Sequence, residues 1–179
     1  AAMGYEVQTG KELWKVCYKG GFSNSSQPVQ AGGLALVNTG HGVARLLAVP
    51  LDGSGDLTAS GIKWKIEADV PLRSSPIIIG PNGYMTSDSG VLTCFEAATG
   101  AKLFRQRLGG GNFSASPITD GRQIWLFDEK GAGTVIQVGT EFKELAANKL
   151  ADGCMGTPAV SGKAFYVRTK TALYRIEEK

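Results

Sequence analysis

Residues 72–108 read LRSSPIIIGPNGYMTSDSGVLTCFEAATGAKLFRQRL, and this stretch decides the fold. Its apolar and alternating segments are separated by turn signals at Gly80–Gly83 (GPNG), Asp88–Gly90 (DSG) and Ala98–Gly100 (ATG). Turns at such short spacing predict four antiparallel strands connected by hairpins. Since a four-stranded unit of this size cannot bury both of its own faces, it must pack against neighbouring units.

The same unit recurs along the chain. The first strand of each unit is expected to begin at Ser23, Arg73, Ser114 or Met155, and these residues are 50, 41 and 41 positions apart. Three residues later, with the same spacings, come Ser26, Pro76, Pro117 and Pro158. Each unit ends with a large residue, Trp14, Trp64, Phe104 or Leu145, and these residues are 50, 40 and 41 positions apart. A period near 41 is typical of repeat architectures, and we expect an all-β propeller of about four four-stranded antiparallel blades rather than a linear solenoid.

We expect one partial propeller domain over residues 1–179. Its units are expected at 1–20 (the end of a blade), 21–69, 70–110, 111–151 and 152–179 (an incomplete blade). Unit 21–69 is longer than the others, and the excess at Pro50–Gly61 is rich in Gly, Ser and Asp, which indicates a surface loop.

Both ends of the chain read as interrupted blades. Ala1–Glu6 and Thr171–Glu177 each read as a third strand, which favours the C-terminal portion of a longer ring, about half of an eight-bladed one. Two other arrangements stay open: Lys11–Tyr18 completes the last blade and closes a four-bladed ring, or the chain associates with a second copy through exposed strand edges.

Composition excludes several classes of protein. The chain is 42% hydrophobic and 20% charged, and its net charge of +3 is spread without a basic run, which gives nucleic-acid binding little support. No apolar stretch approaches the ~20 residues of a membrane-spanning helix. The cysteines, Cys17, Cys94 and Cys154, have neither metal-ligand spacing nor a disulfide pattern, and we interpret them as small buried hydrophobic residues.

Two segments, GYEVQTGKELW (Gly4–Trp14) and CFEAATGAKLF (Cys94–Phe104), resemble the repeat A-x-D-x-x-T-G-x-x-x-W of the PQQ-like β-propeller family. A third, QVGTEFKEL (137–145), has lost the Thr-Gly order. The resemblance implies that blades dock onto one another through Thr9, Gly10, Trp14, Trp64, Thr99, Gly100 and Phe104. The family includes quinoprotein dehydrogenases and outer-membrane assembly lipoproteins, so the resemblance also implies an exported, periplasmic bacterial protein.

The resemblance does not extend to the cofactor. Quinone-binding members carry a pair of adjacent cysteines and a Glu-Asn-Asp set around calcium and the quinone, and the sequence matches neither. We therefore expect no cofactor, no metal and no catalytic residue. His41 reads as a turn residue, Asp88 as a turn Asp bonded to its own backbone, and DGSGD (Asp52–Asp56) lacks the closing Glu of a calcium loop.

In a propeller the first residues of the inner strands surround the mouth of the central channel. The expected mouth residues are Ser23, Arg73, Ser114, Met155, Phe22 and Phe113. Arg73 would either bind a carboxylate or phosphate, or pair with an acidic loop residue. The favoured function is a non-catalytic binding or scaffold module with a protein, peptide or small-anion ligand. The alternative is part of a quinoprotein-type oxidoreductase whose cofactor ligands lie mostly outside this chain.

Overall fold

The computed structural model describes residues 1–177, which form strands and no helix. The expectation of an all-β fold with four-stranded antiparallel sheets is therefore confirmed. We name the sheets blade 1, β4 (Val29–Ala31), β5 (Leu34–Asn38), β7 (Leu46–Pro50) and β9 (Trp64–Ile66); blade 2, β10 (Ile77–Ile79), β11 (Asn82–Thr86), β12 (Val91–Glu96) and β13 (Lys102–Arg107); and blade 3, β14 (Ile118–Thr119), β15 (Gln123–Phe127), β16 (Ala132–Gln137) and β17 (Glu144–Lys149).

Three smaller assemblies complete the described chain. Blade 4 has three strands, β18 (Ala159–Ser161), β19 (Ala164–Arg168) and β20 (Leu173–Glu177). The N-terminal hairpin consists of β1 (Ala2–Tyr5) and β2 (Glu12–Val16), and β2 pairs in parallel with β8 (Gly55–Asp56) from the blade 1 loop. A two-stranded ribbon beside blade 1 consists of β3 (Gly21–Phe22) and β6 (His41–Gly42).

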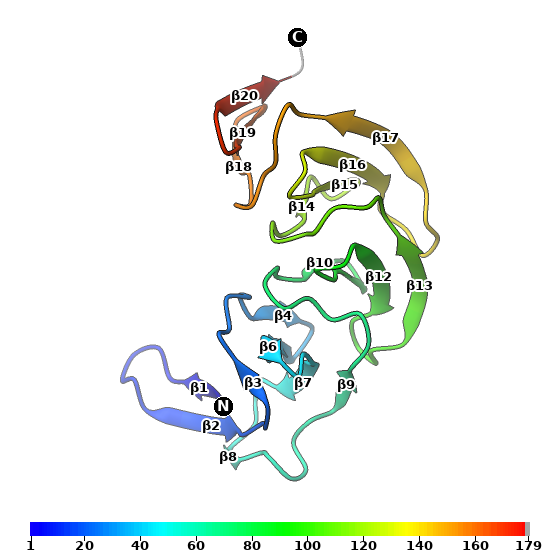
Figure 1. Ribbon diagram of the computed structural model, residues 1–179. Helices are drawn as coiled ribbons and strands as arrows, with labels where there is room; N and C mark the ends of the chain where they lie inside the picture. Colours follow the sequence, from blue (N-terminus) through cyan, green and yellow to red (C-terminus); the bar gives the residue numbers. More distant parts are fainter. Residues whose placement is uncertain (178–179) are drawn as a thin grey trace.

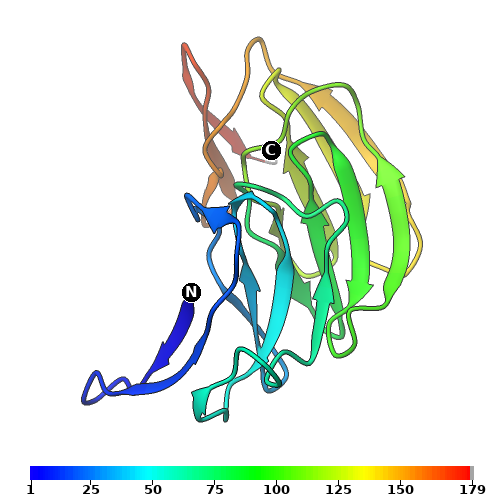
Figure 2. The ribbon, with the colours of Figure 1, turned by 60° about the horizontal axis from the view of Figure 1, so that its bottom comes forward.

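The blades follow one another along an arc (Figure 1), with β4, β10, β14 and β18 on its concave side and β9, β13 and β17 on its convex side. Figure 2 shows the blades side by side, with the axes of their antiparallel strands roughly aligned. The N-terminal hairpin and β20 lie at opposite ends of the arc, and β2 pairs with β1 and β8. This differs from the four-bladed closure in which Lys11–Tyr18 would complete the last blade.

The inner strands begin later than the sequence pattern indicated. They start at Val29, Ile77, Ile118 and Ala159, so Ser23, Arg73, Ser114 and Met155 lie in the segments that precede them. Each strand follows directly after a proline, which has no N–H to give to a strand ladder. The backbone just before the proline instead bonds to the neighbouring blade.

The bonds between blades are made by hydroxyl groups in successive repeats. The N–H of Gln27 donates to Ser75 Oγ (2.8 Å), that of Ser75 to Ser116 Oγ (2.9 Å), and that of Ser116 to Thr157 Oγ1 (2.9 Å). We call this series the hydroxyl ladder. It connects blade 1 to blade 4 through one repeated bond and satisfies backbone donors that the strands leave unpaired.

The hydroxyl ladder also corrects the alignment of the first unit. Pro28 precedes β4 as Pro76 precedes β10, and Ser25 Oγ donates to the Arg73 carbonyl across a separation of 48 residues. The counterpart of Arg73 is therefore Ser25 rather than Ser23, and Pro28 replaces Ser26 as the counterpart of Pro76. Because Ser23, Ser25 and Ser26 lie close together, the repeat pattern was matched at Ser23 instead of Ser25.

A bulky outer-strand residue packs at the interface between the N-terminal hairpin and blade 1, and another packs at the interface between blades 1 and 2. Trp14 is 5% exposed and packs with Leu47 and Val49 of blade 1. Trp64 packs on blade 2, where its ring meets Phe95 edge-on at 5.8 Å and covers Gly100. A Cβ built on Gly100 would lie 2.7 Å from that ring, so the glycine is needed for the close approach.

The two Thr-Gly turns have the same construction. In one, Thr9 Oγ1 donates to the Glu6 carboxylate and accepts from the Lys11 N–H; in the other, Thr99 does the same with Glu96 and Ala101. Gly10 and Gly100 have φ of 70° and 74°, which glycine adopts without strain. The turn of blade 3, where the Thr-Gly order is lost, is held instead by Tyr84 of blade 2: its hydroxyl donates to the Gly139 carbonyl at 2.8 Å.

Leu145 does not occupy the docking position that the sequence assigned to it. Trp64 pairs with Ala48, Phe104 with Cys94, and the matching pair in blade 3 is Val135 with Ala146. A register shift between Val135 and Ile136 leaves Leu145 out of the pairing, and its side chain is 43% exposed. In blade 3 the docking position is therefore occupied by Ala146, one residue after the large side chain of Leu145.

The Pro50–Gly61 segment is a strap between sheets as well as a surface loop. It contains β8, which pairs in parallel with β2, and the Leu57 N–H donates to the Lys15 carbonyl at 2.8 Å. Thr58 Oγ1 accepts from the Cys17 N–H at 2.9 Å. The extra length of this unit therefore binds blade 1 to the N-terminal hairpin.

We predict that Trp64→Ala lowers the free energy of unfolding by about 3 kcal/mol, the lower end of the range for emptying a large aromatic site, because Trp64 is only partly buried. Leu145→Ala is the matched control and should change it by no more than ~0.5 kcal/mol, as surface substitutions do. Urea denaturation of both variants checks this. Similar losses in the two variants would contradict the alignment of Ala146 with Trp64.

The cysteines are predicted to differ in reactivity. Burial raises the pKa of the Cys94 thiol to about 11, and it also raises the pKa of Cys154, while Cys17 is exposed. At pH 8 only about one Cys94 in a thousand is then the reactive thiolate. We expect iodoacetamide to alkylate Cys17 in the native protein and all of the cysteines in urea, as read by mass spectrometry. Rapid native labelling of Cys94 would contradict its buried place between blades 2 and 3.

Candidate functional site

The segments before the inner strands and the turns between second and third strands lie at the same end of the blades, which we call the rim. All six of the expected mouth residues precede an inner strand: Phe22, Ser23, Arg73, Phe113, Ser114 and Met155. Phe113 does not contribute to the mouth surface, because it is 3% exposed and packs in the core between blades 2 and 3. Ser23 adopts a left-handed backbone with φ of 49° just after β3.

Arg73 is held between two carboxylates. Its Nε lies 2.6 Å from Asp88 Oδ2, and one terminal nitrogen lies 3.0 Å from Glu129 Oε1. Partial burial acts to lower the pKa of Arg73, but the hydrogen bond and charge of Asp88, together with Glu129, raise it above its ordinary value. The geometry corresponds to the pairing with an acidic loop residue that the sequence analysis left open as one role for Arg73.

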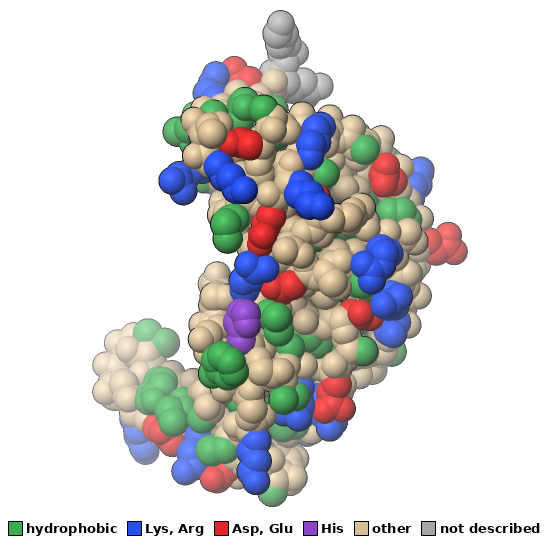
Figure 3. Space-filling model, in the orientation of Figure 1, with side chains coloured by type: hydrophobic (Ala, Val, Ile, Leu, Met, Phe, Trp, Pro, Cys, Tyr) green, Lys and Arg blue, Asp and Glu red, His purple; other side chains and the backbone are tan. Residues whose placement is uncertain are grey.

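Backbone and hydroxyl donors complete this cluster. Asp88 Oδ1 accepts from the Leu72 N–H at 2.7 Å, and Ser114 Oγ donates to Glu129 Oε1. Arg73, Asp88, Glu129 and Ser114 thus join blades 2 and 3 at the rim. With one cation and two carboxylates the cluster has a net negative charge, and Figure 3 shows charges of both signs meeting on the concave side.

Phe22 is an exposed aromatic residue on a rigid support. It pairs with His41 across the β3–β6 ribbon, the two rings lie 6.1 Å apart, and the Phe22 side chain is 61% exposed. Gly42, at φ of 90°, approaches so closely that a Cβ there would lie 2.1 Å from the Gly20 carbonyl. The ribbon therefore admits no side chain at Gly42, and its close backbone approach brings Phe22 beside His41.

Further apolar side chains are exposed at the rim. Val43, just beyond the ribbon, is 44% exposed, and Met155, the counterpart of Arg73 in blade 4, is 55% exposed. The rim therefore has apolar residues on blades 1 and 4 and the paired charges between them. This is an arrangement that can contact another protein through its apolar parts and orient it through its charged part.

The side chains of the other candidates from the sequence are engaged in contacts within the protein. His41 lies under Phe22, and Asp88 bonds to Leu72 and Arg73 instead of to its own turn. In the DGSGD segment, Asp56 accepts from the Thr58 N–H and pairs with Lys15 at 3.6 Å. Residues 1–177 contain no cluster of three or more His, Cys, Asp or Glu side chains suited to a metal ion.

Sequence reasoning missed Glu129, although the signal was present. Asp88 and Glu129 occupy equivalent places after the second strands of blades 2 and 3, where blade 1 has Gly40 and blade 4 has Lys170. An alignment of these turns would have placed both carboxylates at the rim. It would also have shown that the rim charge changes from blade to blade.

The rim does not fit a pyrroloquinoline quinone, which is a tricarboxylate and needs cations or metal to bind. Arg73 already contacts two carboxylates, and a third acceptor would compete with Asp88 and Glu129. The buried cysteines, Cys94 and Cys154, lie in different hydrophobic clusters, one between blades 2 and 3 and one between blades 3 and 4.

Comparison with solved structures supports the fold. The crystal structure of BamB from Moraxella catarrhalis matches with a TM-score of 0.74 at 18% identity, over 98% of this chain and 51% of that one. A quinohemoprotein alcohol dehydrogenase from Pseudomonas putida HK5 matches with a TM-score of 0.66 at 10% identity, over 87% and 29%. The computationally designed Ika4 protein matches with a TM-score of 0.72 at 7% identity, over 94% and 99%. At these identities the likeness shows the fold alone.

The chain spans about half the length of the BamB structure that it matches. No curated protein matches the sequence at a significant level. Within residues 1–177 we find no helix with the length and hydropathy needed to cross a membrane.

The sequence model of the family described as outer membrane protein assembly factor BamB matches residues 3–145, which is most of the chain. The repeat, the Thr-Gly turns and the docking of Trp64 on Gly100 agree with that match. The chain therefore belongs to the BamB family of PQQ-like β-propeller proteins.

Proposed function

We propose that this chain is a non-catalytic, protein-binding propeller module of an exported bacterial protein, and that it binds its partner at the rim. The observation that carries the proposal is Phe22, a large aromatic side chain left 61% exposed on a glycine-supported ribbon. Burying an exposed aromatic ring against another surface removes apolar area from water, which is favourable. Aromatic residues that need little ordering on binding are typical hot spots of interfaces.

The family description supports a partner that is itself a protein. It names an assembly factor of outer membrane proteins, whose work is contact with other polypeptides. An exported, periplasmic location belongs to this proposal and draws support from the same description. We retain self-association through strand edges as a further expectation, since β20 pairs only with β19 among the described residues.

The paired charges have a supporting role in this proposal. Arg73 is already bonded to Asp88 and Glu129, so its main effect is to fix the turns of blades 2 and 3 relative to each other. A small anion would have to displace one of these carboxylates. We therefore place the binding energy on Phe22, Val43 and Met155, and the orientation of the partner on the charges.

The alternative, part of a quinoprotein oxidoreductase, draws support only from the fold of structural neighbours such as the alcohol dehydrogenase described above. The donor set at the rim does not fit the quinone. That the chain binds no cofactor stays a prediction, and stoichiometric uptake of pyrroloquinoline quinone with calcium would contradict it.

The test uses peptides selected from a phage-displayed random library against the immobilised chain. We predict that Phe22→Ala weakens the selected peptides by about thirtyfold or more, which corresponds to the loss of ~2 kcal/mol expected of a hot spot. Val7→Ala is the control, because Val7 is 94% exposed but lies in the β1–β2 turn, away from the rim. Dissociation constants by fluorescence anisotropy decide the matter: unchanged affinity in Phe22→Ala would place the binding surface elsewhere.

A further inference from the structure

The interfaces between successive blades are built from equivalent positions, and the third differs from the first two. On the face that each blade turns to the next, two sets of cross-strand partners line up across the second, third and fourth strands. In blade 1 they are Leu36–Ala48–Trp64 and Asn38–Leu46–Ile66; in blade 2, Tyr84–Cys94–Phe104 and Thr86–Leu92–Gln106; in blade 3, Trp125–Val135–Ala146 and Phe127–Gly133–Asn148.

Blade 3 has lost volume at two of these positions. Ala146 stands where Trp64 and Phe104 stand in the other blades, and Gly133 stands where Leu46 and Leu92 are 1% and 0% exposed. Because Trp125 and Phe127 on the second strand are larger than their counterparts, the loss is compensated only in part. A cavity of about 310 Å³ remains between blades 3 and 4.

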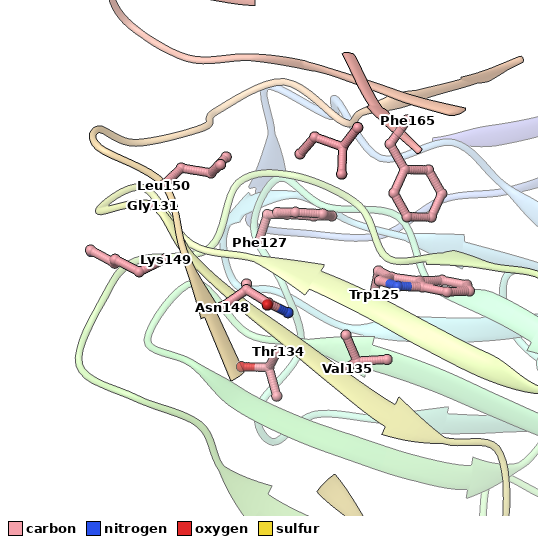
Figure 4. Close-up of a pocket in the computed structure, with 11 residues that line it drawn as sticks. Trp125, Phe127, Gly131, Thr134, Val135, Asn148, Lys149, Leu150 and Phe165 are labelled. Atoms are coloured by element: carbon pink, nitrogen blue, oxygen red, sulfur yellow. The ribbon is translucent and has the colours of Figure 1, made fainter. Parts of the chain in front are cut away.

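The cavity has aromatic walls and a polar opening. Trp125 and Phe127 of blade 3 face Phe165 of blade 4, and Ile176 and Leu150 complete the apolar lining (Figure 4). The Trp125 and Phe165 rings meet edge-on at 5.0 Å. Asn148 and Thr134 line the same cavity, and the Asn148 amide makes no protein hydrogen bond within residues 1–177.

The interfaces between blades 1 and 2 and between blades 2 and 3 indicate what kind of molecule fits the cavity. In each of them an aromatic ring from the outer strand meets another ring edge-on: Trp64 meets Phe95 at 5.8 Å, and Phe104 meets Phe142 at 6.2 Å. The third interface keeps aromatic walls but supplies no such ring of its own. An apolar cavity of ~150 Å³ is enough to bind benzene, so the larger cavity here has room for a bicyclic ring.

We propose that this cavity is a binding site for a small, neutral, planar aromatic molecule of about the size of indole. The ring would lie against Phe127 and the Trp125–Phe165 pair, whose rings already meet edge-on, and the Asn148 amide would bond a polar atom at its edge. A neutral ligand is favoured because Lys149 directs its ammonium to the Lys130 carbonyl. The cavity is not lined by Phe22, Val43 or Met155, so the site is independent of the function proposed above.

Gly133 offers a direct test. A Cβ built there lies 3.5 Å from Phe127, an ordinary contact, and Gly133 is not among the residues of positive φ, so the backbone accepts a side chain. Gly133→Leu restores the residue of the sister blades and fills the cavity. Gly109→Leu is the matched control, since nothing lies within 4 Å of a Cβ at that position.

The experiment measures indole binding to the full chain by saturation-transfer NMR, and thermal stability by circular dichroism. We expect indole to bind and to raise the melting temperature progressively, approaching a logarithmic dependence on its concentration above the dissociation constant. Gly133→Leu should bind indole at least tenfold more weakly and, without ligand, melt about 2–4 °C higher, whereas Gly109→Leu should bind as the wild type does.

Two outcomes overturn the proposal: no binding of indole to the wild type, or equal affinity in Gly133→Leu and Gly109→Leu. A gain in melting temperature in Gly133→Leu without any indole binding to the wild type would show a packing defect and would also reject the ligand site. If Gly133→Leu does not fold, Asn148→Phe places a ring in the cavity from β17, where Asn148 lines it, and the same loss of binding is expected of it.

Discussion

The hydroxyl ladder is the interaction on which the arrangement of blades depends. One N–H from the segment before each inner strand donates to a serine or threonine of the next repeat, across separations of 48, 41 and 41 residues. Because the bond is directional, it fixes where each sheet begins relative to the next in a way that apolar packing alone does not. The proline that follows then starts the inner strand at a defined place.

Apolar packing supplies the stabilisation and is divided among separate interfaces. Each pair of neighbouring sheets has its own hydrophobic cluster, so every blade is buried only by its neighbours. In such an architecture the interfaces can diverge independently. The docking ring is Trp64 in one interface and Phe104 in the next, and Ala146 replaces it in the third. The strap at Leu57 and Thr58 is a further local solution, found where the Thr-Gly turn of blade 1 is missing.

Most of the fold was predictable from the sequence because glycine-rich turns recur with one period and separate short β-branched segments. The docking of Trp64 on Gly100 was predictable from the Thr-Gly motif. The alignment of Ser25 was missed because neighbouring serines satisfy the same sequence pattern, although Pro28, three residues after Ser25, matches Pro76. The exposure of Leu145 was missed because Leu145 was aligned with Phe104. Blade 2 has the same register shift, which leaves Leu103 out of the pairing and 39% exposed, and Leu145 is the counterpart of Leu103. The contact of Glu129 with Arg73 required knowing that blades 2 and 3 are neighbours in space.

Amide hydrogen exchange at Gln27, Ser75 and Ser116, measured by NMR, tests the hydroxyl ladder most directly. These amides lie outside the strands, yet the account predicts that they exchange as slowly as amides within blade 2, because each is bonded to the next repeat. Ser116→Ala should speed exchange at the Ser75 amide, whose acceptor is removed, more than at the Gln27 amide, whose acceptor remains. Exchange of all three at the rate of exposed loops in the wild type would contradict the ladder, and with it the account of how the blades are aligned.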